Sequence, residues 1–255
     1  MDGLSASEDR PELRTVQQVV QRAVREAVRE RVTLVGASRT DAGVHAWGQT
    51  ASFTASDDRR GAPDERLAMA INARLPPDVL VRSCVRTRDD FHAISDCVAK
   101  SYRYTLHATR ERPLWNRRLV HHIYLPLDEA AMREGAARFV GEHDFAAFAT
   151  AGHGRESTVR RVFDCRIERP NDGELVEMHI VGNGFLWNMV RIIGGTLVDI
   201  GLGRKKPEDV TAAILSRDRR LAGPTLPARG LCLMWGLYPG DVPGQSQSPT
   251  EDAPA

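Results

Sequence analysis

The run Gly-Ala-Ser-Arg-Thr-Asp-Ala-Gly-Val-His-Ala at residues 36–46 is the feature that most constrains this chain. It places a single carboxylate, Asp41, between two glycines, directly after an apolar stretch at residues 32–35 that is typical of a strand. Glycine lets a backbone turn sharply and approach a ligand closely, and loops at strand ends often present catalytic groups. An aspartate in such a loop can also bond only its own backbone. The run is longer than a turn requires, and we therefore predict a functional loop around Asp41.

This run does not stand alone. It resembles the signature of the TruA-type tRNA pseudouridine synthases, in which a Gly-Arg-Thr-Asp-Ala-Gly-Val-His-Ala stretch carries the catalytic aspartate. Further stretches that resemble this family follow in the family's order, at residues 75–79, 91–93, 100–104, 143–145, 183–191 and 218–231. The resemblance covers the chain from about residue 15 to residue 238. Several separate stretches in the correct order are far more specific than any single one.

The resemblance implies an α+β pseudouridine synthase fold, with two related halves whose antiparallel sheets join, flanking helices and a central active-site cleft. We expect residues 1–99 to form the N-terminal half with the Asp41 loop, and residues 100–238 the C-terminal half. Residues 239–255 are rich in Pro, Gly and Ser and are expected to form a disordered tail. The family's opening Tyr-Asp-Gly strand is not in this sequence. We expect that the natural start lies upstream or that the strand has been lost.

Hydrophobic periodicity and turn-forming residues predict the individual elements. Apolar residues recur at helical spacing in residues 16–31, and the same reasoning predicts helices at residues 129–140, after an Asp128 cap, at 188–200 and at 207–215. Runs of β-branched and aromatic residues predict strands at residues 32–35, 49–53, 79–85, 102–107, 162–168, 176–181 and 232–238.

The resemblance assigns catalytic roles to Asp41, Tyr102 and Arg191. In the family reaction the bond from ribose C1′ to uracil N1 breaks, and C1′ is joined to C5. Asp41 is expected at C1′, as the nucleophile or as the base that starts elimination, and the sequence does not choose between these roles. Arg191 is expected to keep the carboxylate ionised, because an opposite charge favours the charged form. Tyr102 is expected to stack on the everted base, with its hydroxyl near C5.

Ordinary structural roles are the alternative for two of these residues. Tyr102 and Tyr104 are two residues apart on one predicted strand and therefore share a face of it, so both also fit packing in the core. Arg191 lies among apolar residues of a predicted helix and fits a solvated surface arginine. The motif context favours the catalytic roles for Tyr102 and Arg191 only.

Substrate contacts and partners also follow from the resemblance. The expected substrate-binding residues are Arg39, His45, Tyr102, Phe185 and Leu231, and the expected substrate is uridine in the anticodon stem-loop of tRNAs, at the family's tRNA positions 38–40. Family members act as homodimers, so a homodimer is expected. The net charge of +1 neither requires nor forbids RNA, but arginines and lysines gather locally, as phosphate binding requires, at residues 22–31, 103–118 and 204–206.

Composition and spacing argue against other classes. No apolar run approaches membrane-spanning length and no secretory signal is present, so we expect a cytoplasmic protein without a membrane partner. The four cysteines form no Cys-x-x-Cys pair, and His45, His92 and His143 lack ligand spacing, so no metal site is expected. An isomerisation needs no redox carrier, and no cofactor is expected. The remaining alternative is a non-catalytic RNA-binding or tRNA-folding protein that retains the synthase fold.

Overall fold

The computed structural model describes residues 14–150, 152 and 157–239, and these residues form two compact units. Unit 1 contains residues 14–37, 50–96 and Pro239, and unit 2 contains residues 38–49 and 97–238. The Asp41 segment, which the predicted boundary near Lys100 assigns to the N-terminal half, packs with unit 2. The expected tail lies outside the described residues from residue 240 onward.

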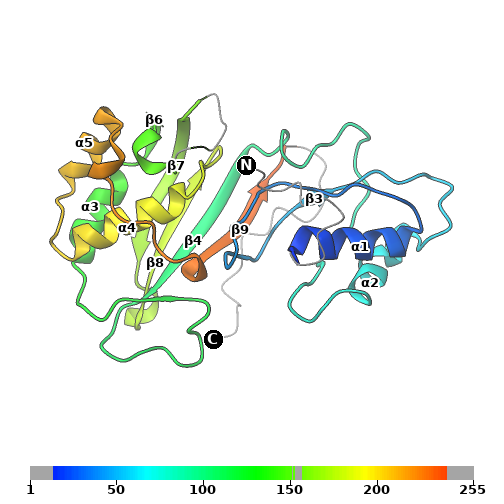
Figure 1. Cartoon of the computed structure of the whole chain (residues 1–255), viewed down its shortest axis with the longest axis horizontal. Coiled ribbons are helices and arrows are strands. Elements are labelled where there is room, and N and C mark those ends of the chain that lie inside the picture. Colours follow the sequence, from blue (N-terminus) through cyan, green and yellow to red (C-terminus); the bar gives the residue numbers. More distant parts are fainter. Residues whose placement is uncertain (1–13, 151, 153–156, 240–255) are drawn as a thin grey trace. The chain divides into compact units, whose positions relative to one another are not determined.

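Unit 1 is built around two helices, α1 (Val16–Val28) and α2 (Asp64–Asn72) (Figure 1). Helix α1 was predicted, and it begins with a capping box in which Thr15 and Gln18 satisfy each other's backbone N–H groups. It ends three residues before the predicted limit, because Arg29 takes a left-handed conformation with φ 58°. Helix α2 was not predicted, since only Leu67 and Ile71 are buried along it and two residues give too short an apolar stripe.

The strands of unit 1 are short. Strand β1 (Val35–Gly36) pairs with β3 (Ala51–Ser52) in antiparallel fashion, and β3 lies within the predicted strand 49–53 whereas β1 overlaps the predicted strand 32–35 only at Val35. The predicted strand at residues 79–85 is wrong. The side chain of Asn72 donates to the Val81 carbonyl and accepts from the Val81 N–H, both at 2.8 Å, and so occupies the groups that a β-ladder would need.

Unit 2 contains a seven-stranded sheet with the order β2-β9-β4-β8-β7-β6, and β5 pairs with β4 beside this path (Figure 1). The strands are β2 (His45–Ala46), β4 (Ala99–His107), β5 (His121–His122), β6 (Gly141–Asp144), β7 (Val159–Glu168), β8 (Leu175–Gly182) and β9 (Leu231–Leu237). The long strands β4, β7, β8 and β9 were predicted and pair antiparallel. The two-residue strand β2 pairs in parallel with β9, and the two-residue strand β5 pairs in parallel with β4. The sequence did not predict these two strands, because so short a strand shows no periodicity.

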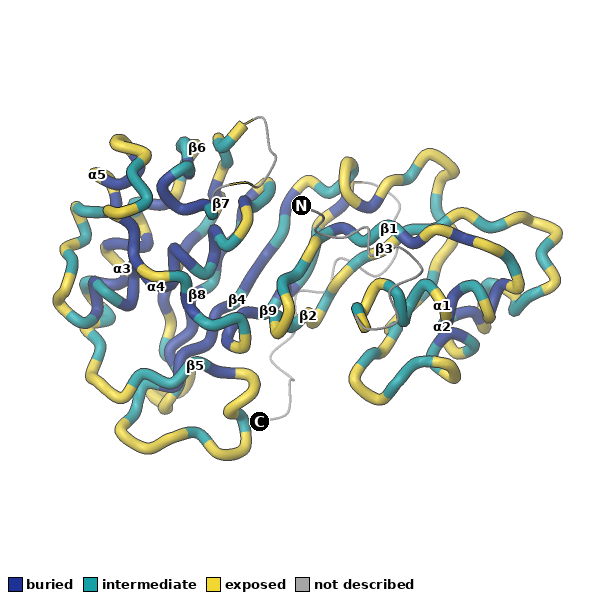
Figure 2. Tube along the Cα trace, in the orientation of Figure 1, coloured by how far each residue is buried: buried dark blue, intermediate teal, exposed yellow. Residues whose placement is uncertain are grey.

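Helices cover the sheet of unit 2. Helices α3 (Glu129–Ala137) and α4 (Met189–Gly201) contact each other and the sheet, and α5 (Glu208–Ser216) packs beside β6 (Figure 1). All three helices were predicted, and the expected Asp128 cap accepts a hydrogen bond from the N–H of Ala131 at 3.0 Å. Buried residues follow the central strands and α4 (Figure 2). No helix in the described ranges combines the length and the apolar character needed to cross a bilayer.

Helix α4 and the segment 222–226 lie in unusually close contact. A Cβ atom on Gly195 would lie 1.9 Å from the carbonyl oxygen of Pro224, and one on Gly223 would lie 2.4 Å from the nitrogen of Thr196. The Thr196 hydroxyl accepts a hydrogen bond from the N–H of Gly223 at 2.8 Å. Two glycines therefore fix the backbone next to Leu226.

We predict that Gly195→Ala lowers the free energy of unfolding by at least about 2 kcal/mol. Overpacking against rigid backbone costs roughly 1–3 kcal/mol or more, and exceeds the gain of about 1 kcal/mol that Ala brings to a helix. Urea unfolding would measure this. The control is Gly184→Ala, where the nearest atoms lie 3.8 Å from the added Cβ and belong to the Arg160 side chain, so the change should stay within about 0.5 kcal/mol. Equal stability of Gly195→Ala and the wild type would contradict the packing argument.

Candidate active site

The segment that carries Asp41 is closed on itself at its base and joined to the sheet of unit 2 through β2. The Gln49 side chain donates to the Ser38 carbonyl at 2.7 Å and accepts from the Ser38 N–H at 3.2 Å, which closes the segment into a loop. Strand β2 pairs with β9, and the N–H of Trp47 continues this contact with a 2.8 Å hydrogen bond to the Leu233 carbonyl. The loop therefore lies on the sheet edge formed by β9.

A tight turn sets the direction of the loop after Asp41. The N–H of Val44 donates to the Asp41 carbonyl at 3.0 Å, and Gly43 has a φ of +84°. A type II turn places a positive φ at its third residue, which strongly favours glycine there. The second glycine of the sequence signature thus has a definite conformational role, as predicted.

The guanidinium of Arg191 contacts the carboxylate of Asp41 directly. The Arg191 Nη1 atom lies 2.9 Å from Asp41 Oδ2, and the side chains are 17% and 35% exposed. Arg191 also donates from Nε to the Leu226 carbonyl at 2.7 Å and from Nη1 to Asn188 Oδ1 at 2.6 Å. The arginine is therefore held by acceptors on two sides before it reaches Asp41, which gives the pair a fixed geometry.

The second carboxylate oxygen of Asp41 also has a donor. The indole N–H of Trp187 lies 3.2 Å from Asp41 Oδ1, while the Trp187 side chain remains about half exposed. Asn188, the next residue, has a left-handed φ of 62° and donates from its side chain to Thr150 Oγ1 at 2.9 Å. The start of α4 thus supplies two donors to one carboxylate.

Tyr102 lies on β4 at a β-bulge, where the pairing with β9 shifts register between Ser101 and Tyr102. Bulges often redirect a side chain beside a functional site. The Tyr102 ring is buried and packs edge-on against Phe185, with 5.2 Å between the ring centroids. Burial raises the pKa of Tyr102, a hydrogen bond with the Ser38 side chain opposes this, and the nearby Asp41 charge raises the pKa further. The phenol is therefore protonated at neutral pH.

The other residues named from the sequence occupy different environments. Arg39 is exposed on the Asp41 loop, whereas Leu231 is buried in the core of unit 2. His45 has its Nε2 atom 2.9 Å from the Arg118 carbonyl oxygen. Tyr104 is buried and donates from its hydroxyl to the Pro227 carbonyl at 2.7 Å, which is the core role that strand alternation predicted.

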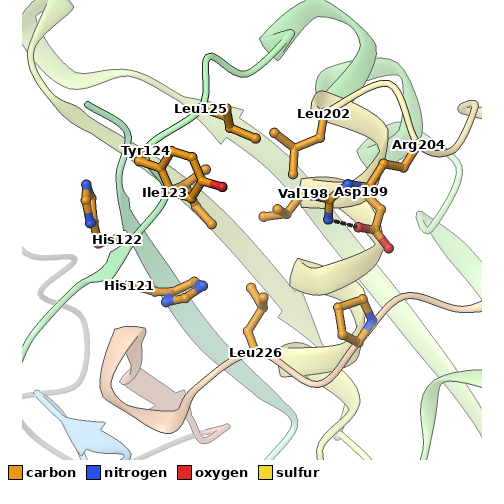
Figure 3. A pocket seen from close by; sticks show the side chains of 11 residues that line it. His121, His122, Ile123, Tyr124, Leu125, Val198, Asp199, Leu202, Arg204 and Leu226 are labelled. Atoms are coloured by element: carbon orange, nitrogen blue, oxygen red, sulfur yellow. Dashed lines mark hydrogen bonds and ion pairs between the residues drawn. The ribbon is translucent and has the colours of Figure 1, made fainter. Parts of the chain in front are cut away.

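A pocket of about 200 Å³ lies next to this site, between β5, α4 and the segment 224–226 (Figure 3). Its lining includes His121, Val198 and Leu226, and an ion pair between Arg204 and Asp199 borders it. Asp41 is not among the lining residues. We place the candidate site at Asp41 because the charged side chains converge there, and the pocket borders it only through Leu226, whose carbonyl holds Arg191.

Comparison with known proteins decides the family. The family model described as tRNA pseudouridine synthase matches residues 136–239. A protein named tRNA pseudouridine synthase A from Caldicellulosiruptor saccharolyticus is 39% identical over 92% of this chain and 92% of its own length. A tRNA pseudouridine synthase A 2 from Clostridium tetani is 41% identical over 89% of both chains, and a tRNA pseudouridine synthase A from Pelobacter propionicus is 41% identical over 88% of this chain and 90% of its own. The chain belongs to the TruA-type tRNA pseudouridine synthases.

Membership of the TruA-type synthases confirms the family that the sequence motifs predicted, and the structure adds contacts that the motifs did not indicate. These are the Trp187 donor, the Leu226 carbonyl that holds Arg191, and the Ser38 hydrogen bond to Tyr102. The position of a backbone carbonyl cannot be inferred from residue identity, and the sequence pattern gave no role to Trp187. In the described ranges, no three His, Cys, Asp or Glu side chains gather as a metal site would require.

The buried tyrosines give a testable dependence of stability on pH. Burial raises the pKa values of Tyr102 and Tyr104 above the ordinary value of 10.0, so the folded protein keeps protons that the unfolded chain releases. Their contribution to stability is complete below pH 10 and is lost as the pH rises above it, by up to about 1.4 kcal/mol per pH unit for each group. We predict that Tyr104→Phe makes this loss smaller in urea unfolding across alkaline pH. Replacement of the exposed Tyr124 by Phe is the control, and an unchanged slope in Tyr104→Phe would contradict the assignment.

Proposed function

We propose that this chain is a tRNA pseudouridine synthase that isomerises uridine in the anticodon stem-loop of tRNAs, with Asp41 as the catalytic carboxylate. One observation carries the proposal: the aspartate of the family signature accepts a 2.9 Å hydrogen bond from the arginine of a second family motif, 150 residues away. The relatives that share about 40% of the sequence over about 90% of the chain are named as enzymes of this kind. The structure offers no observation that favours a non-catalytic RNA-binding protein.

Asp41 is assigned the step at the ribose. Its carboxylate acts at C1′ as the nucleophile or as the base that starts elimination, the bond to uracil N1 breaks, and C1′ then joins C5. Arg191 and Trp187 each donate to one carboxylate oxygen, so the side chain is oriented before substrate arrives. Such preorganised donors require no rearrangement at the moment of reaction. Arg191 also favours the ionised carboxylate that either role needs.

Tyr102 is assigned a role at the base. C5 loses one proton and N1 gains one in the isomerisation, so the neutral phenol of Tyr102 takes part only as a relay that receives the C5 proton while it passes its own proton on toward N1, and the Ser38 side chain is its hydrogen-bond partner. The edge-on contact with Phe185 restrains the ring while the detached uracil turns. Phe185, Arg39, His45 and Leu231 are proposed to shape the nucleotide site around this ring.

The substrate base must leave its stack, since C1′ and C5 cannot both be reached inside a helix, and this costs a few kcal/mol that a loop nucleotide reduces. We further propose the family arrangement of two related halves with joined sheets and a central cleft, in a cytoplasmic homodimer. Structured RNA is read largely through its shape and its phosphates, which suits the arginine clusters of this chain.

Asp41→Asn tests the assignment most directly. It keeps the size of the side chain and removes the charge, so pseudouridine formation should be lost while tRNA affinity stays within about threefold. Chemical mapping of pseudouridine in an unmodified tRNA transcript would measure turnover, with a filter-binding assay for affinity. Normal turnover by Asp41→Asn would refute the mechanism, and no product from the wild type in any anticodon arm would refute the function.

The two donors to Asp41 should contribute unequally. Arg191→Lys cannot bond both the Leu226 carbonyl and Asp41, and loss of one preorganised donor costs roughly 100-fold to 1,000-fold in kcat. Trp187→Phe removes one longer, half-exposed hydrogen bond, worth about 1 kcal/mol or a factor of about 5. Single-turnover rates with saturating protein would compare them. A larger loss in Trp187→Phe than in Arg191→Lys would reverse this order and the roles assigned.

A further inference from the structure

The loop of residues 108–120, which joins β4 to β5, is largely exposed to solvent (Figure 2), and its exposed residues include Leu114, Trp115 and Leu119. Trp115 is 97% exposed, more than any other large hydrophobic side chain in the described residues, and Leu114 and Leu119 are 66% and 56% exposed. Scattered exposed apolar residues are ordinary, but three within six residues form a contiguous segment. An uncovered tryptophan in such a segment indicates a contact surface.

The same loop is strongly basic. It carries Arg110, Arg112, Arg117 and Arg118 against a single carboxylate, Glu111. Arg117 donates to the Leu114 carbonyl at 2.7 Å and so holds the turn that displays Trp115. The guanidinium groups of the other three arginines make no hydrogen bond or ion pair within the part of the chain that the structure describes. Fifteen described arginines elsewhere in the chain form an ion pair with an Asp or Glu side chain, whereas these three do not and are positioned for an anionic partner.

The loop is also connected to the candidate site. His45, in the strand that follows the Asp41 loop, bonds the Arg118 carbonyl through Nε2 at 2.9 Å. Loop 108–120 and the Asp41 loop both belong to unit 2, so this contact lies within one compact body. A polymer held at Asp41 therefore has the basic loop as a neighbour.

We propose that loop 108–120 is an RNA contact in which Trp115 stacks on an unpaired base and Arg110, Arg112 and Arg118 bind phosphates. The proposal rests on the proposed function and names the surface that grips the substrate beyond the reacting nucleotide. Base stacking on an aromatic ring next to cationic side chains is the usual mode of binding single-stranded nucleic acid. A second copy of the chain is a poorer occupant, because two such loops face to face bring like charges within a Debye length of about 8 Å.

Binding should be measured with unmodified tRNA in the Asp41→Asn background, so that no turnover occurs. Trp115→Ala should weaken affinity by roughly 5-fold to 150-fold, and Trp115→Phe should recover most of it because a ring remains. Trp115 lies almost entirely in solvent, so its replacement should leave the melting temperature unchanged. Leu215→Ala on α5, where the side chain is 77% exposed, is the matched control and should bind as the parent does.

The arginines should be tested by the dependence of affinity on salt. Removing three phosphate contacts with Arg110→Gln, Arg112→Gln and Arg118→Gln together should lower the slope of log affinity against log salt by roughly 2 to 3. The control combines Arg133→Gln, Arg166→Gln and Arg220→Gln, which changes net charge equally but removes arginines already paired with carboxylates. The control slope should match the parent.

Kinetics and oligomeric state complete the test. In the active protein, Trp115→Ala should raise KM and leave kcat unchanged, because the loop contacts the substrate away from the reacting bonds. Unchanged affinity in Trp115→Ala together with an unchanged salt slope in the arginine variant would overturn the proposal. Conversion of a dimer to a monomer by Trp115→Ala, seen by sedimentation equilibrium without RNA, would assign the surface to a second copy and overturn it too. If the wild type binds tRNA but forms no pseudouridine, the proposed function fails, but the binding data still test whether loop 108–120 contacts RNA.

Discussion

The contact between Arg191 and Asp41 is the interaction on which the rest of the site depends. Arg191, on α4, contacts Asp41 in the loop that precedes β2, the first strand in the sheet order. Its Nε atom also donates to the Leu226 carbonyl in the segment 222–226, which holds the side chain in place. That carbonyl is in place because two glycines let the segment lie directly against α4. The close packing at Gly195 and Gly223 therefore determines where the Arg191 guanidinium contacts the Asp41 carboxylate.

The electrostatic character of the site follows from unequal exposure. Asp41 and Trp187 remain partly open to solvent, whereas Tyr102 is buried and Arg191 largely so. The arginine favours a charged carboxylate, and burial favours an uncharged phenol at Tyr102. One compact unit thus holds an ionised carboxylate paired with an arginine and, close to it, a protonated phenol.

The sequence predicted the long elements and named the residues that the structure brings together at the candidate site, and it failed where local pattern carries little information. Asp41, Tyr102 and Arg191 stand in long motifs, and α4 and the central strands have clear periodicity. The strand predicted at residues 79–85 is absent because the side chain of Asn72, nine residues earlier at the end of α2, takes the hydrogen-bonding groups of Val81. The Leu226 carbonyl, the Trp187 donor and the short parallel strands arise from tertiary packing, which residue identity does not reveal.

The pairing of β2 with β9 has a consequence for biogenesis. His45 and Cys232 are register partners although all the other strands of this sheet lie between them in the sequence, so the strand that receives the Asp41 loop is synthesised after those strands. Contacts between such distant residues close a very long loop and form slowly. A nascent chain therefore lacks the partner strand of β2 until residues 231–237 have been synthesised, and a fragment cut short before residue 231 would lack that strand altogether.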